Sequence, residues 1–157
     1  MLGSKHGSMK TIPYTNINLI LLSSSLNFPI LYPVVVCSTW GIFNSFNFTY
    51  LLNPKAMEKL NEKCNNQLLL GNIITHFIPI CITLYKPPKC IKFKHGIISS
   101  CSHLMWGLYV SKGTLCCNKI YFPLPKKNWY LLWSIALISE LLTPSLMTKY
   151  KKIIKSV

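Results

Sequence analysis

The feature that most limits how this chain can fold is a run of 44 residues, from Thr11 to Pro54, without a single Asp, Glu, Lys or Arg. A second uncharged run extends from Cys64 to Tyr85. Elements of a soluble domain turn one face to water, so charged side chains are mixed through each of them. Apolar blocks of about 20 residues separated by charged gaps instead match the thickness of a bilayer. The pattern indicates a polytopic membrane protein.

Four apolar segments have lengths suited to membrane spans. They lie at residues 26–46, 67–85, 96–111 and 128–147, and the third is short and contains several Ser and His residues. Prolines within these segments would break helices in water, but membrane helices tolerate them because neighbouring groups satisfy the freed carbonyls. We therefore expect an all-α fold, a polytopic transmembrane helical bundle of about four spans, with residues 1–157 forming a single integral membrane domain.

The charged residues are almost all basic. The chain has 17 lysines, no arginine and only three carboxylates, which gives a formal net charge of +14. Such a charge is common in nucleic-acid-binding proteins, but these lysines flank apolar blocks and do not line one face, so a nucleic-acid partner ranks last. The expected partner is the lipid bilayer. The two tails and residues 86–95 hold ten lysines against seven in the other loops, which favours cytosolic termini.

The N-terminal region and the cysteines give weaker evidence about the class of protein. Residues 17–22 are apolar and follow Lys5 and Lys10, but no small-x-small cleavage site comes after them, so an amphipathic lead-in or the end of a longer region is preferred to a signal peptide. The seven cysteines form no CxxC pair and show no zinc-like spacing with His. We expect reduced thiols, no metal and no cofactor.

Three ionisable side chains fall inside the predicted spans, where an ionisable group is costly and is a functional hypothesis by default. They are His76, His103 and Glu140. For His76, use in catalysis is weighed equally with an interhelical hydrogen bond of about 1 kcal/mol. We expect a structural role for His103. Glu140 needs a partner such as a lysine, a histidine or a water-filled cavity, and a structural or positioning role is expected.

His76 is the best candidate for a catalytic residue. Asn72 lies four residues earlier, on the same helical face, where its amide can orient the imidazole. A neutral histidine in an apolar site can act as a general base toward a hydroxyl nucleophile. The scarcity of carboxylates disfavours a two-carboxylate hydrolase, so a Ser or Thr plus His dyad is the hydrolytic arrangement that this composition supports.

Several short motifs occur in an order shared with a known family. They are Phe28-Pro29, Trp40, Pro54-Lys55, Asn72 with His76 and Pro79, Trp106, Gly113, Tyr121-Phe122-Pro123, and Glu140. In this order and approximate spacing, over roughly residues 26 to 142, the chain resembles the androgen-induced gene 1 protein / androgen-dependent TFPI-regulating protein family of multispan membrane proteins.

The resemblance implies hydrolysis of fatty acid esters of hydroxy fatty acids by an intramembrane threonine and a histidine, in the endoplasmic reticulum, elsewhere in the endomembrane system, or in the plasma membrane. The family histidine corresponds to His76. The family threonine lies upstream of the Phe-Pro span; Thr11 and Thr15 are found there, but their surroundings do not match, so the nucleophile is unassigned. The chain is then a truncated hydrolase, an isoform with a replaced start, or an inactive relative.

Two other functions stay open. The first is a catalytically inactive membrane protein with a regulatory or interaction role, in which His76 only joins helices. The second is a small channel or transporter. Such a protein requires a line of polar groups through its spans, and the predicted spans contain few of them.

Overall fold

The computed structural model describes residues 14–52, 54, 58, 71, 73–116 and 125–156, and within these ranges the chain is all-helical with no strand. The elements, in order, are α1 (Tyr14–Ser25), α2 (Tyr32–Leu52), the π-helix η1 (Ile73–Phe77), α5 (Ile78–Tyr85), α6 (Phe93–Val110) and α7 (Lys126–Ser156). The prediction of an all-α fold is confirmed.

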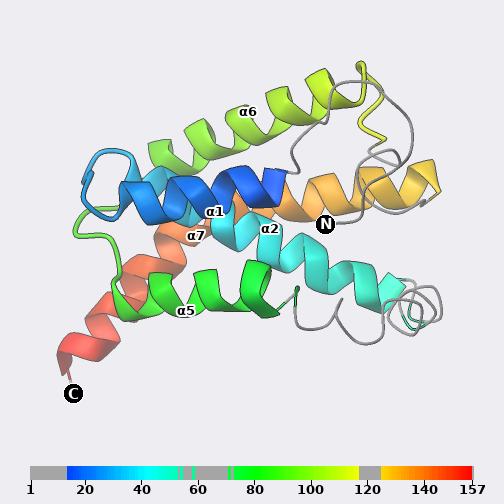
Figure 1. Cartoon of the computed structure of the whole chain (residues 1–157). Coiled ribbons are helices and arrows are strands. Elements are labelled where there is room, and N and C mark those ends of the chain that lie inside the picture. Colours follow the sequence, from blue (N-terminus) through cyan, green and yellow to red (C-terminus); the bar gives the residue numbers. More distant parts are fainter. Residues whose placement is uncertain are drawn as a thin grey trace.

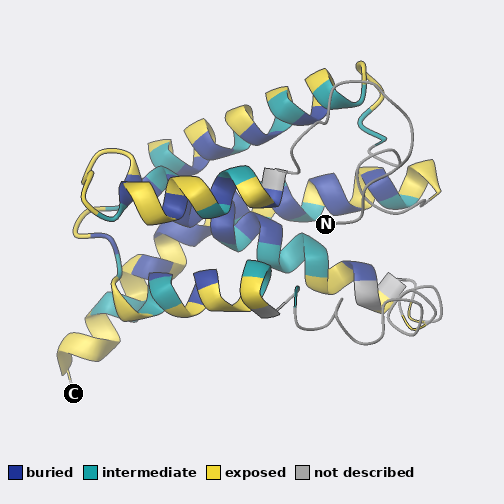
Figure 2. Cartoon of the chain, viewed as in Figure 1, coloured by how far each residue is buried: buried dark blue, intermediate teal, exposed yellow. Residues whose placement is uncertain are grey.

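Helices α2 and α7 pack against each other and form the centre of the bundle (Figure 1). Helix α6 contacts both of them, whereas α1, η1 and α5 contact α2. One buried cluster joins Leu22, Tyr32, Val35, Val36 and Met147, and a second joins Trp129, Leu132 and Trp133. Helix α2 therefore has neighbouring elements on several sides, which explains why its first three turns are almost completely buried (Figure 2).

Each of the four predicted spans overlaps a helix, but the ends differ. Helix α2, which corresponds to the first predicted span, begins at Tyr32 rather than at residue 26. Pro29 lies in a turn, and Pro33 occupies the first helical turn, where a missing N–H costs nothing. Helix α6 agrees with the predicted 96–111 within three residues. Helix α7 begins at Lys126 and extends beyond residue 147 to Ser156, passing through Pro144. Residues 67–70 lie outside the described part of the chain.

Apolar side chains face outward on all the helices. Examples are Ile20, Phe48, Met105 and Leu142, which are between 41% and 70% exposed. Buried positions, in contrast, include Asn18, Thr39, Ser99 and Glu140. The described helices therefore expose many large apolar side chains, and their interior holds polar side chains beside the two apolar clusters.

Length and composition identify one described helix that could cross a membrane, α7, and one shorter apolar helix, Ile74–Tyr85. Helix α2 has 21 residues, but Asn44 and Asn47 lower the hydropathy of its second half. Helix α1 has 12 residues and is therefore about 18 Å long, less than the thickness of the hydrocarbon core.

Candidate active site

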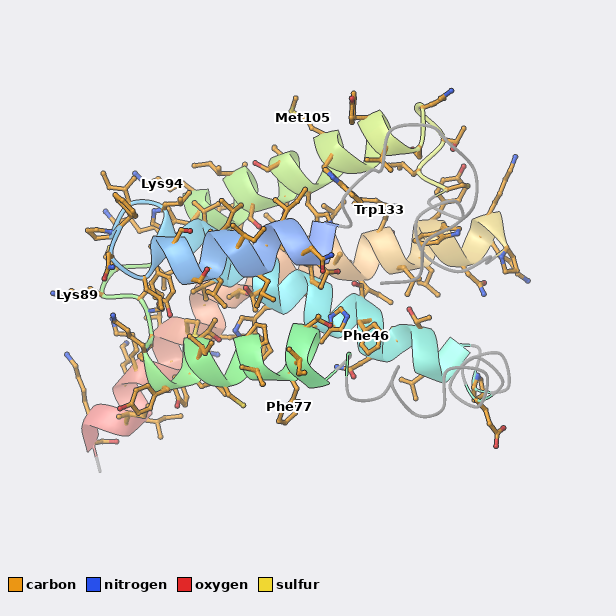
Figure 3. All side chains as sticks on the ribbon, in the orientation of Figure 1. Phe46, Phe77, Lys89, Lys94, Met105 and Trp133 are labelled. Atoms are coloured by element: carbon orange, nitrogen blue, oxygen red, sulfur yellow. The ribbon has the colours of Figure 1, made fainter. Side chains whose placement is uncertain are left out.

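His76 lies in η1, immediately before α5. Its imidazole stacks on the ring of Phe46 from α2, with ring centroids 3.9 Å apart and an interplanar angle of 9°; Phe46 is seen beside the start of α5 in Figure 3. The Nδ1 atom is buried and has no hydrogen-bond partner among the described residues. Asn72, the predicted positioning residue, lies outside the described residues.

The π-helix around His76 has a local cause in the sequence. Pro79 has no N–H to donate to the carbonyl of Thr75, so a regular α-helical ladder cannot pass through this position. The wider π turn precedes Pro79 and changes the direction in which residues 73–77 project. Such turns occur frequently at functional sites.

Burying an imidazole nitrogen in an apolar site without a hydrogen-bond partner costs free energy, so such a nitrogen in a folded protein calls for an explanation, for example a catalytic role. It can accept a proton from a hydroxyl that approaches it, as a general base does. The stacking on Phe46 fixes the plane of the ring and therefore the direction of Nδ1. The arrangement has a base and an orienting contact, and it lacks an identified nucleophile.

Helix α1 supplies the best candidate nucleophile. It contacts η1, and its first turn lies at the same end of the bundle as the start of α5 (Figure 1). Thr15 is in this first turn and is 9% exposed.

The other two ionisable residues of the spans are brought together. His103 Nδ1 lies 2.7 Å from Glu140 Oε1, which joins α6 to α7 across 37 residues of sequence. Glu140 is completely buried, and its Oε2 atom has no partner among the described residues. The His103 ring also meets Trp133 edge to face, with centroids 4.9 Å apart. The sequence indicated that Glu140 needs a partner, but it could not identify His103 as that partner.

A cavity of about 620 Å³ lies between α1, α2 and α6. Its wall is formed mainly by apolar side chains such as Leu21, Val35 and Ile98, and its size falls within the usual range for small-molecule sites. Asn18, Ser38 and Ser99 are the buried polar residues in this wall, and the Ser99 hydroxyl has no hydrogen-bond partner among the described residues. Asn18 is three residues after Thr15, so the cavity extends to the same face of α1.

The described residues contain no group of three or more His, Cys, Asp or Glu side chains that could hold a metal ion. The five cysteines that the structure describes are unpaired.

Comparison of the chain with protein-family models, curated proteins and solved structures found no match.

Proposed function

We propose that this chain is a multi-pass membrane protein that hydrolyses a long-chain lipid ester, with His76 as the general base and Thr15 as the nucleophile. The observation that carries the proposal is an oriented imidazole within an apolar bundle, whose buried Nδ1 has no hydrogen-bond partner among the residues that the structure describes. The resemblance to the androgen-induced family supports the same histidine and suggests fatty acid esters of hydroxy fatty acids as the substrate.

In this mechanism the Thr15 hydroxyl attacks the ester carbonyl while His76 accepts its proton. The tetrahedral intermediate collapses, the alcohol leaves with a proton from His76, and an acyl group remains on the threonine. A water molecule, activated by the same histidine, releases the fatty acid and restores the hydroxyl. The contact of α1 with η1 supports this pairing, as does the burial of Thr15.

The cavity between α1, α2 and α6 supports a lipid substrate. It is lined mainly by apolar side chains and includes Asn18, which lies one helical turn from the proposed nucleophile. An acyl chain in this cavity would be shielded from water, and substrate would arrive by lateral diffusion within the bilayer. The proposal includes four membrane spans, formed by α2, by η1 together with α5, by α6 and by α7. The membrane is an internal membrane or the plasma membrane.

A fluorophosphonate probe tests the proposal, because it reacts with activated serine and threonine hydroxyls. We expect labelling of the purified chain in detergent, loss of labelling in His76→Ala and Thr15→Ala, and retention in Thr15→Ser. Thr148→Ala is the matched control, since Thr148 is an exposed threonine near the far end of α7. Size-exclusion chromatography checks that each variant is folded.

Two results would overturn parts of the proposal. If the folded wild type is not labelled, the chain is the catalytically inactive regulatory or interaction protein, and the stacking of His76 on Phe46 is purely structural. If Thr15→Ala is labelled as strongly as wild type while His76→Ala is not, the base is correct and the nucleophile is another hydroxyl.

A further inference from the structure

The loop between α5 and α6 and the last turns of α7 enclose a second cavity, of about 290 Å³, which the His76 site does not use. Its lining is Lys89, Cys90, Ile91, Thr148, Lys151, Lys152 and Lys155. Lys89 lies at the end of the bundle where the C-terminal turns of α7 emerge (Figure 3). Four of the lining residues are lysines and none is acidic, and we refer to this cavity as the basic pocket.

The basic pocket is held in shape by contacts between the loop and α7. Lys151 Nζ donates to the carbonyl oxygens of Pro88, at 3.0 Å, and Lys89, at 2.6 Å. The hydroxyl of Tyr150 donates to the carbonyl of Leu84 at 3.3 Å, and Ile91 packs on the buried cluster that contains Met147. These contacts fix the backbone of the loop relative to α7, and so fix the positions from which the lysine side chains extend, which lowers the entropic cost of binding.

The charge of the basic pocket is not neutralised within the described structure. The one ion pair found in the described residues is that of His103 with Glu140. Lys89, Lys152 and Lys155 are exposed, and they come close to one another around a single cavity. Repulsion between charges within a Debye length favours binding of an anion that contacts several of them at once.

The location of the basic pocket indicates the source of that anion. The apolar part of α7 ends near Met147, and Lys149 begins a run that is rich in lysine. In a span, this transition marks the level of the lipid headgroups, where basic pockets recognise phosphorylated headgroups. We propose that the basic pocket binds the headgroup of an anionic membrane phospholipid with several phosphates, of the phosphatidylinositol bisphosphate class.

Native mass spectrometry of the full chain in detergent tests this proposal, with dioctanoyl phosphatidylinositol bisphosphate as the probe. Each lysine near an anionic headgroup contributes roughly fivefold to affinity. Lys152→Gln combined with Lys155→Gln is therefore expected to weaken binding by about 25-fold. The matched control combines Lys126→Gln with Lys127→Gln, which removes the same charge from exposed positions at the other end of α7 and is expected to leave binding unchanged.

Three outcomes contradict the proposal. The first is equal binding by the wild type and the pocket variant, and the second is equal binding of dioctanoyl phosphatidylcholine. The third is binding of free inositol trisphosphate as tight as that of the lipid, which would assign the pocket to a soluble phosphate ligand. Fluorophosphonate labelling does not depend on this pocket, so failure here leaves the proposed hydrolase unaffected.

Discussion

Glu140 shows how a single buried carboxyl can hold two helices of an apolar bundle together. Its Oε1 atom lies 2.7 Å from His103 Nδ1, within hydrogen-bond distance, and this contact links the middle of α6 to the middle of α7. Removing one member of a buried pair leaves the other member without its partner. The loss of folding free energy is therefore larger than the net stabilisation that the bond provides. Helix α2 also approaches this carboxyl closely, because a Cβ on Gly41 would meet the Glu140 side chain.

We therefore expect Glu140→Ala to destabilise the protein by about 3 kcal/mol, whereas Glu140→Gln, which retains a hydrogen-bonding group, loses much less. Thermal unfolding in detergent, followed by size-exclusion fluorescence, measures the difference. Ile138→Ala is the control, because Ile138 lies on the same helix and is 56% exposed. Equal melting temperatures for the Ala and Gln variants would show that the pair does not stabilise the bundle.

Gly107 is a second position where one atom decides the packing. A Cβ at this residue would overlap the Trp133 ring, which is fixed in place by a 2.9 Å hydrogen bond from Nε1 to the Leu115 carbonyl. We expect Gly107→Ala to cost about 2 kcal/mol through overpacking. Gly71→Ala is the control, since no atom of the described residues lies within 4 Å of the added methyl group. The same unfolding measurement applies, and equal stability of the two variants would contradict the packing seen here.

At the scale of an element, the start of α6 depends on a histidine. His95 Nδ1 accepts the backbone N–H of Lys92 at 2.9 Å, which satisfies one of the amides at the helix N-terminus. His95 precedes the apolar segment that begins at Gly96. Burial lowers the pKa of His95 below its usual 6.5, and the positive charges of Lys94 and Lys92 lower it further. The neutral form is the one that accepts this bond.

We predict that His95 titrates below pH 6.5 in the folded protein, and that Lys94→Met raises its pKa only in part, because burial is the larger cause. Since the folded pKa lies below the unfolded value, the contribution of His95 to stability is complete above about pH 6.5 and is lost as the pH falls through the folded pKa. Histidine NMR titration in micelles measures the shift, with His95→Gln identifying the resonance. A pKa at or above 6.5 would contradict the cap.

Helix content and approximate helix positions could be predicted because they depend on local pattern. The uncharged runs and the proline positions limit where helices begin, and all four predicted segments overlap a helix. The continuation of α7 to Ser156 was missed because the search for apolar spans stops at lysines, which a helix end tolerates well. The pairing of His103 with Glu140 and the contact of α1 with η1 depend on tertiary packing, which no single-sequence periodicity encodes.

At the scale of the whole molecule, the structure brings two of the lysine-rich segments together. The bonds from Lys151 to Pro88 and Lys89 place the α5–α6 loop and the end of α7 at one end of the bundle. The lysines of both segments are among the ten whose excess over the other loops led to the prediction of cytosolic termini. The turn that follows α6 contains Cys116 and lies at the opposite end of this helix from Cys90.

Cysteine labelling tests this orientation. Two variants retain a single cysteine, either Cys90 or Cys116, and a membrane-impermeant maleimide is added to cells whose plasma membrane alone is permeabilised. For a protein of an internal membrane with four spans, whose α5–α6 loop and C-terminus face the cytosol, we expect labelling at Cys90 and protection at Cys116 until detergent is added. A variant that retains only Cys101, exposed in the middle of α6, is the control for a thiol that faces lipid and reacts slowly in both conditions. Labelling of Cys116 without detergent would contradict passage of α6 across the membrane, and labelling of Cys116 with protection of Cys90 would reverse the orientation.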